Sequence, residues 1–369
     1  MRFSGKPGFL VILTLLAAPI AAQESTPPPY RVTQPADRIT CFSPGVETSP
    51  ITTCVIETGV GLVLVDTGLS PSMAKRTRAR IAAELGRDDI RWVINTHSHF
   101  DHTGGNQIYS DALIIGHENA PAAMDAFYAG RDRWIQRRQH WLARQEAAVA
   151  DAPPGSNDAV ALGERLSFNR EMMADLRDGY VSTPPDLGFS DRLTVYADDL
   201  EIRLLYFGRA HTASDILVSI PALGALFTGD LFHEDALGVG AGAQPLDVER
   251  WLTTLDAVLV DEAEVEIVIG GHGLLFTPQW IAAQRRYLGE VWAAVGTAKT
   301  AGADLDQLRA ELAFDGRFAF IADQLSVPAD DLADQHDRNL RTLWRVGQVS
   351  AAEEIGRTAR QSGAEATRA

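Results

Sequence analysis

The chain has 369 residues, of which 46% are hydrophobic and 22% charged, a composition typical of a globular protein with a sizeable core. Acidic residues outnumber basic ones 49 to 33, giving a formal net charge of -16. A surface of this sign repels phosphate backbones, so we expect a small-molecule substrate and no nucleic-acid partner.

The first 22 residues have the order of a secretory signal peptide. Arg2 and Lys6 form a short basic region, residues 9–18 are largely apolar, and Ile20-Ala21-Ala22 offers small residues for cleavage. The alternative is an uncleaved membrane anchor, but the apolar run is short and Pro19 interrupts its end. We therefore expect a periplasmic or secreted protein with no stable membrane span after cleavage.

The first half of the domain alternates strand-like and helical patterns. Residues 23–37, with three consecutive prolines, predict an extended leader. Ser70-Pro71 predicts a helix start and Gly86 its end. The predicted strands in this half are 51–58, 61–66, 91–95 and 112–116.

Residues 118–180 are mostly helical in pattern, with a break at Pro153-Pro154-Gly155. Two interpretations stay open: helices packed on the outside of the fold, or a lid bordering an active site. Further strands are predicted at 193–197, 201–207, 215–220, 225–228 and 265–269. Asp247 caps a predicted amphipathic helix, and the pattern is helical from Pro278 nearly to the end. This alternation predicts a layered α/β fold.

The only two cysteines, Cys41 and Cys54, lie early in the predicted mature chain. In an oxidising compartment they could pair, and the alternative is two small buried thiols. Neither lies near the histidine motifs, so we assign neither to a metal.

Three histidines and an aspartate occur within six residues, in the run His97-Ser98-His99-Phe100-Asp101-His102 after a predicted strand. Imidazole and carboxylate groups are the ligands that zinc accepts alongside thiolate. A structural role would require each of these polar groups to be solvated or hydrogen-bonded. The glycine-rich turn that follows, Thr103-Gly104-Gly105-Asn106, adds no core residue. The run therefore predicts a metal site.

The pattern His-x-His-x-Asp-His after a strand resembles the signature of the metallo-β-lactamase superfamily. Other motifs of that family follow its order here: Asp66 in Val-Asp-Thr-Gly, His211 in Gly-Arg-Ala-His-Thr, Asp230 in Phe-Thr-Gly-Asp and His272 in Gly-His-Gly. The resemblance covers residues 40–285.

The resemblance implies two zinc ions per chain, with iron or manganese as alternatives. It places His97, His99 and His211 on the first metal, and Asp101, His102 and His272 on the second, with Asp230 bridging both. Asp66 would orient a ligand through a hydrogen bond, and Asp101 and Asp230 are the candidate catalytic carboxylates.

The family fold is a four-layer αββα sandwich of two mixed sheets flanked by helices. The implied organisation is a signal peptide (1–22), the leader (23–37), a metallo-β-lactamase domain (38–285) with a helical insertion at 118–180, and a helical C-terminal extension (286–369). The sequence leaves the oligomeric state open.

The resemblance implies a dinuclear zinc hydrolase in which a metal-bridging hydroxide attacks an ester, lactone, thioester or amide. Dedicated β-lactamases of the family generally lack an aspartate at the position of Asp230, although lactam cleavage on the same site is an alternative. A mononuclear iron persulfide dioxygenase and a non-catalytic metal-binding protein are the other two alternatives.

Two more histidines are candidate substrate-facing residues. His233 lies three positions after Asp230, and His117 ends a predicted strand. For His233 the alternative is an ordinary surface position.

Overall fold

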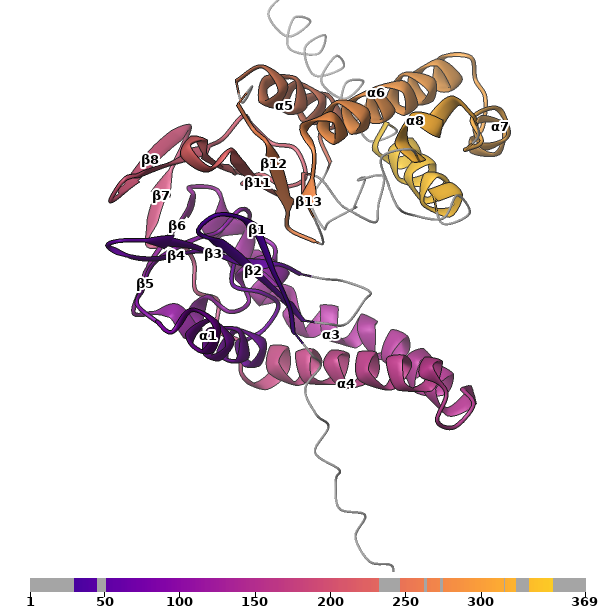
Figure 1. Cartoon of the computed structure of the whole chain (residues 1–369). Coiled ribbons are helices and arrows are strands. Elements are labelled where there is room, and N and C mark those ends of the chain that lie inside the picture. Colours follow the sequence, from indigo (N-terminus) through magenta and orange to yellow (C-terminus); the bar gives the residue numbers. More distant parts are fainter. Residues whose placement is uncertain are drawn as a thin grey trace, which may run out of the picture.

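The computed structural model describes residues 30–44, 51–231, 246–261, 264–272, 275–314, 316–322 and 332–347. The predicted signal peptide and His233 lie outside these ranges. The described residues form two β-sheets stacked face to face with helices on their outer faces (Figure 1).

The first sheet has seven strands in chain order, β1 to β7. Its first four strands pair antiparallel, whereas β4, β5, β6 and β7 run parallel. The bounds are β1 Tyr30–Ala36, β2 Ile39–Pro44, β3 Thr53–Thr58, β4 Gly61–Val65, β5 Ile90–Ile94, β6 Leu113–His117 and β7 Leu187–Phe189. Every residue of β4 is buried, which explains its continuous apolar sequence.

The second sheet has six strands in the order β13-β12-β11-β10-β9-β8. All neighbours pair antiparallel except β11 and β12, which run parallel. The bounds are β8 Arg192–Ala197, β9 Leu200–Leu205, β10 Leu217–Ile220, β11 Ala225–Gly229, β12 Ile267–Gly270 and β13 Leu275–Phe276.

One apolar core joins the facing sides of the two sheets. Ile56, Val63 and Ile94 of the first sheet share a buried cluster with Leu204 and Val218 of the second. Such side chains alternate with outward-facing ones along a strand, so each strand contributes to two layers.

Helix α1 (Pro71–Leu85) covers the outer face of the first sheet. The Ser70 hydroxyl accepts the Met73 N–H at its start, and Gly86 ends it with a φ of 67°, where glycine is favoured. Ala74 and Ile81 share a buried cluster with that sheet. Helices α5 (Val248–Asp261) and α6 (Pro278–Thr300) cover the second sheet. The architecture is therefore the αββα sandwich that the resemblance to the family implied.

Two long helices, α3 (Ala120–Asp151) and α4 (Asn157–Asp178), form a hairpin beside this sandwich (Figure 1). The chain reverses between them at the predicted Pro-Pro-Gly break. Their apolar side chains pack with Leu69 and Met73, which lie at and beside the start of α1. The hairpin is thus anchored next to the loop that follows β4.

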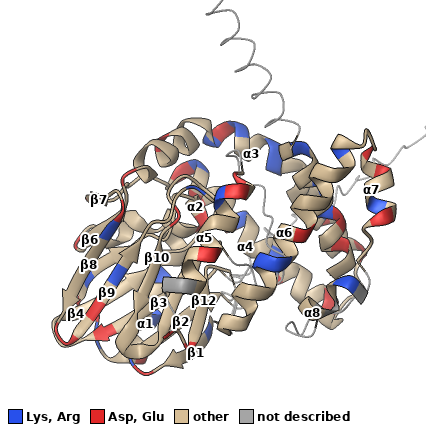
Figure 2. Ribbon diagram, turned by 90° about the horizontal axis from the view of Figure 1, so that it is seen from above, with Lys and Arg blue, Asp and Glu red and all other residues tan. Residues whose placement is uncertain are grey.

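Short elements complete the fold: α2 (Phe100–Thr103), α7 (Leu305–Glu311), α8 (Ala319–Ala322) and the 3-10 turns η1 (Asn106–Tyr109), η2 (Pro221–Leu223) and η3 (Gly316–Phe318). Residues 332–347 are also helical. Acidic and basic residues are interspersed along the surface helices (Figure 2). None of the helices described is both long and apolar enough to cross a membrane.

One feature differs from the sequence predictions, and a second decides between two predicted alternatives. Residues 30–36 of the predicted leader form β1, which adds to the sheet through backbone pairing with β2. Cys41 on β2 lies opposite Cys54 on β3, with their Cα atoms 4.0 Å apart, and the two form a disulfide. Of the two alternatives for the cysteines, the structure therefore has the disulfide.

Candidate metal centre

The histidine run lies at the carboxyl end of β5, between the ends of its neighbours β4 and β6. His97 and His99 precede the short helix α2, which carries Asp101 and His102. The loop is pressed against the chain that follows β4, because a Cβ on Gly105 would lie only 2.3 Å from the Thr67 carbonyl oxygen. Glycine at this position therefore lets the loop approach the end of β4 closely.

The structure brings all seven predicted metal ligands together in two groups. His97, His99, His211 and Asp230 form the first group, and Asp101, His102, His272 and the same Asp230 form the second. Within each group the candidate ligand atoms lie within 4.8 Å of one another. His211 precedes β10, Asp230 follows β11 and His272 follows β12, so the second sheet supplies three of the seven.

Asp230 lies between the two groups. Its Oδ2 is 3.6 Å from Nε2 of His97, 3.6 Å from Nε2 of His211 and 3.2 Å from Nε2 of His272. Its Oδ1 is 3.2 Å from Nε2 of His102. One carboxylate thus reaches both groups.

The nitrogen atoms of the site converge in a way that suits a cation. The His97 Nδ1 pairs with the Thr96 hydroxyl, whereas its buried Nε2 has no hydrogen-bond partner among the described residues. Two imidazole nitrogens, Nε2 of His102 and Nε2 of His272, face each other at 3.2 Å. Buried nitrogens of this kind are normally satisfied, so the donor set fits a metal ion.

Asp66 binds the ring nitrogen of His102 that faces away from the other candidate ligands. Its Oδ2 accepts hydrogen bonds from the His102 Nδ1 at 2.9 Å and the Thr96 hydroxyl at 2.8 Å, and its Oδ1 accepts the Thr96 backbone N–H at 2.8 Å. With the His102 proton on Nδ1, Nε2 is free as a lone-pair donor. Asp66 adopts a φ of 58°, a left-handed conformation that aspartate tolerates better than most residues.

The titration behaviour differs between the two groups. Burial lowers the pKa of His97 well below its ordinary value and also lowers that of His99. Burial also disfavours the charged form of His272, but Asp230 and Asp101 outweigh it and raise its pKa to about 10. Asp230, Asp101 and Asp66 likewise outweigh burial at His102 and raise its pKa. The second group therefore carries the stronger negative field.

A small polar network shapes the loop that carries His211. The buried Asp215 accepts hydrogen bonds from the backbone N–H and the hydroxyl of Thr212, both at 2.6 Å, and from the Ala210 N–H at 3.3 Å. Burial raises the pKa of Asp215 to about 6. Thr96 and Asp215 were not predicted from the sequence. Both lie close to the motifs along the chain, but closeness in sequence does not distinguish a residue that supports a metal ligand from an ordinary neighbour.

His117, the second substrate-facing candidate, lies apart from the two groups. Its Nε2 pairs with the Ser190 carbonyl at 2.9 Å, and its ring stacks on Tyr206 with centroids 3.7 Å apart. It is buried at the end of β6 and links β6 to the segment between β7 and β8. The contacts of His117 are therefore those of a residue that packs neighbouring elements together.

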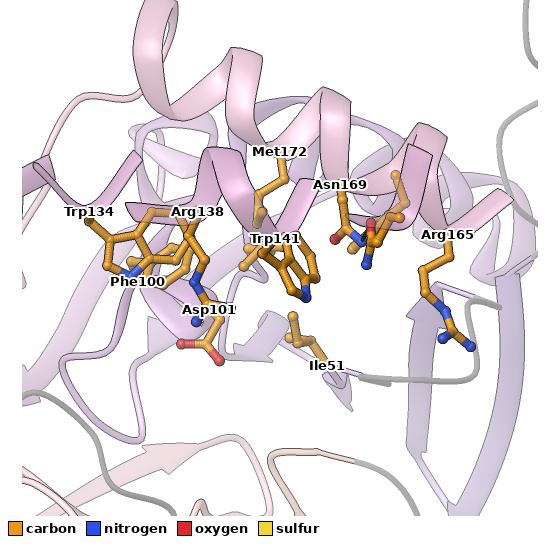
Figure 3. Close-up of a pocket in the computed structure, with 12 residues that line it drawn as sticks. Ile51, Phe100, Asp101, Trp134, Arg138, Trp141, Arg165, Asn169 and Met172 are labelled. Carbon is orange, nitrogen blue, oxygen red and sulfur yellow. Dashed lines mark hydrogen bonds between the residues drawn. The ribbon is translucent and has the colours of Figure 1, made fainter. Parts of the chain in front are cut away.

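A cavity of about 420 Å³ adjoins the second group. Asp101 lies in its wall together with side chains from α3 and α4, as Figure 3 shows. The helical hairpin thus borders the candidate metal centre.

A family model described as "Metallo-beta-lactamase superfamily" matches residues 47–272, which include all seven candidate ligands. Two curated proteins are similar over shorter stretches. The "Metallo-beta-lactamase type 2" of Bacteroides fragilis is 30% identical over 107 residues, covering 29% of this chain and 43% of that protein. The "2,4-dinitroanisole O-demethylase subunit alpha" of Nocardioides sp. (strain JS1661) is 38% identical over 68 residues, covering 18% of this chain and 21% of that protein. The matches span less than half of either relative.

Solved structures show the same fold at low sequence identity. The sec-alkylsulfatase Pisa1 from Pseudomonas sp. superimposes with a TM-score of 0.62 at 17% identity, covering 86% of this chain and 50% of that one. A metallo-beta-lactamase from Pontibacter korlensis superimposes with a TM-score of 0.50 at 16% identity, covering 71% of this chain and 99% of that one. At these identities the likeness concerns the fold alone.

Proposed function

Since the chain belongs to the metallo-β-lactamase superfamily, we propose that it is an exported dinuclear zinc hydrolase that cleaves an ester, lactone, thioester or amide. The observation that carries this proposal is the pair of four-residue groups that share Asp230. A shared carboxylate between two sets of converging ligands is the arrangement expected for two neighbouring metal ions.

We assign His97, His99 and His211 to the first zinc ion, Asp101, His102 and His272 to the second, and Asp230 to both. The donor set supports zinc, which accepts imidazole nitrogen and carboxylate oxygen. Iron or manganese would accept the same ligands. The contacts of Asp66 with His102 support a role for this carboxylate in orienting a ligand of the second ion.

When bound, a zinc pair supplies a water of lowered pKa and a Lewis acid for the substrate carbonyl. The chain itself contributes carboxylates and a recess. Asp101 is partly exposed, with 20% of its side chain accessible, and it lies in the cavity wall. It can therefore accept a proton from a nucleophile or pass one to a leaving group. Asp230, only 4% exposed, holds the two sites together and remains the second candidate for positioning the attacking water.

Cleavage of a β-lactam is the second candidate function. It is favoured by the 30% identity to a protein named "Metallo-beta-lactamase type 2". The presence of Asp230 argues against it, because dedicated β-lactamases generally lack an aspartate at this position of the family motif. A β-lactam is a strained amide, so the same site could open it as a side reaction.

Two independent features, the signal-peptide pattern and the disulfide, support export of the protein. The first 22 residues have the pattern of a signal peptide, and the Cys41–Cys54 bond belongs to proteins of oxidising compartments. We therefore propose a periplasmic or secreted location. Fractionation of cells that express the full chain, followed by N-terminal sequencing of the mature protein, tests it.

The test of the hydrolase is a panel of lactones, thioesters, activated esters, phosphodiesters and β-lactams, given to zinc-loaded protein whose metal content is measured. We expect two zinc ions per chain and turnover of at least one acyl substrate. One iron per chain would contradict the proposal and favour the oxygenase alternative. No zinc binding and no turnover would favour a non-catalytic protein.

A substitution at Asp101 tests the assigned site. Asp101→Ala should lose most of the hydrolysis and the zinc of the second site. Asp125→Ala removes an exposed carboxylate on α3 outside the cavity and should leave both unchanged. Full activity in Asp101→Ala would refute the assignment.

A further inference from the structure

The cavity beside Asp101 has a chemistry of its own. Its volume of about 420 Å³ lies in the range of small-molecule sites, which are mostly apolar with a few placed polar groups. Side chains of α3 and α4 extend toward Asp101 and Ile51 on the opposite wall (Figure 3). Because Asp101 belongs to the candidate metal centre, a molecule in this cavity would reach the reacting groups.

Aromatic rings form one end of the cavity. Trp134 and Trp141 lie two helical turns apart on α3, and Phe100 precedes Asp101. The rings of Phe100 and Trp134 meet edge to face with centroids 5.1 Å apart. Phe100 also stacks on Phe127 with centroids 4.6 Å apart, so its ring is held in place. This end therefore suits an apolar, flat group.

Arg138, an exposed residue of α3, lies against both indole rings. Its guanidinium carbon lies 4.9 Å from the Trp134 ring centroid and 5.5 Å from that of Trp141. Stacking of this kind restrains the side chain and leaves the N–H edges of the guanidinium available for hydrogen bonds. Within the described part of the chain, no carboxylate pairs with Arg138.

Arg165, on α4, brings a second cation to the same cavity. Its Nε is buried and has no hydrogen-bond partner among the residues that the structure describes. A buried guanidinium N–H without an acceptor is costly, and a bound anion would satisfy it. By contrast, Arg170, one turn and a half further along α4, pairs with Glu146 at 2.8 Å.

We propose that this cavity selects substrates that combine an apolar, preferably aromatic, body with an anionic group held either by Arg138, beside Asp101, or by Arg165, at the opposite end of the cavity (Figure 3). The inference rests on the proposed hydrolase function, which it extends from a bond class to a substrate class. Two arginines in one cavity of a chain with net charge -16 mark a local reversal of charge. The aromatic end receives the body, and the bond to be cleaved lies next to Asp101.

A matched pair of esters tests the selection during turnover. The first is the 4-nitrophenyl monoester of 1,4-phenylenediacetic acid, and the second is the same ester with its free carboxylate converted to a carboxamide. We expect kcat/KM for the carboxylate to exceed that for the amide at least tenfold, mainly through KM. Equal values would overturn the inference and leave the hydrolase proposal intact.

Variants identify the groups responsible. Arg138→Gln or Arg165→Gln, whichever removes the arginine that holds the anion, should lower kcat/KM for the carboxylate about tenfold, the effect of losing a charge-assisted hydrogen bond, and leave the amide unchanged. Arg137→Gln removes the same charge from the adjacent, exposed position of α3 outside the cavity and is the matched control. Zinc content and thermal unfolding of each variant show whether it folds.

Binding without turnover separates the two proposals. Calorimetry on zinc-loaded protein with 4-phenylbutanoate, 4-phenylbutane-1-sulfonate and neutral 4-phenylbutanamide should show at least tenfold weaker binding of the amide. Tight binding of only one anion identifies the anion class. At least one of the two arginine variants should lose this preference, whereas an anion bound only to zinc would keep it in both variants. An unchanged preference in both variants would overturn the inference, even if no ester in the panel is hydrolysed.

Discussion

Replacing Asp66 by Asn should weaken the second zinc site without disturbing the first. Asp66 accepts three hydrogen bonds, one from the His102 Nδ1 and two from Thr96. Asparagine has nearly the same shape and tolerates the φ of 58° at this position. It nevertheless replaces one of two acceptor oxygens by an NH2 group, which must face either the Thr96 backbone N–H or the His102 Nδ1. In both orientations His102 loses its ionised acceptor, and in the second its ring must rotate or move its proton to Nε2, where it blocks the lone pair that a metal needs.

The expected size follows from the role of this contact. Loss of a hydrogen bond that orients a metal ligand costs about 10- to 100-fold in metal affinity, or about 1.4–2.8 kcal/mol. Titration against a chromophoric zinc chelator measures both binding steps. The step assigned to His97, His99 and His211 should keep its affinity, because Asp66 contacts none of these three rings within the described structure.

The control is Asp111→Asn, which alters an exposed carboxylate that pairs with Arg78 on the surface. It should leave both zinc affinities unchanged. If Asp66→Asn binds the second zinc as tightly as the native chain does, the orienting role is refuted. A decrease at both steps with a lower melting temperature would instead indicate general damage to the fold.

Two further results are expected. Replacing Cys41 and Cys54 together by Ala should lower the free energy of unfolding by about 3 kcal/mol, because the bond closes a short loop in the unfolded chain, with zinc content unchanged in urea titrations. In metal-free protein, Asp230 and Asp101 outweigh burial and raise the pKa of His272 from 6.5 to about 10. Stability from this pairing is present below pH 6.5 and lost as pH rises through 10, so the melting temperature should fall across that interval, and less in His272→Gln.

The sequence determined the candidate ligands because they lie in short motifs at strand ends. The run from His97 to His102 follows from residue type and spacing along the chain, whereas His211, Asp230 and His272 were assigned through the resemblance to the metallo-β-lactamase superfamily. Parallel neighbours place their carboxyl ends at one edge, so the approach of Asp66 to His102 follows from strand order. Helix α1 was equally predictable, because Ser70, Pro71 and Gly86 act on local backbone geometry.

The edge strand β1 was missed for a physical reason. Residues 30–36 carry a polar sequence at the edge of the sheet, where backbone pairing with β2 holds them and no apolar alternation is required. The two cysteines could not be paired from their spacing alone, because a disulfide depends on strand register. Register places Cys41 opposite Cys54.

Only the tertiary structure decided which residues of 118–180 border the site. Helices α3 and α4 carry charged residues around most of their surface, so the sequence cannot tell Arg138, which lines the cavity, from Arg137, which does not. That distinction depends on how the hairpin packs against Leu69 and Met73 far away in the chain. A local sequence pattern is enough to identify a metal ligand that follows a strand. Which residues line a substrate cavity depends instead on packing between elements that are far apart in the sequence.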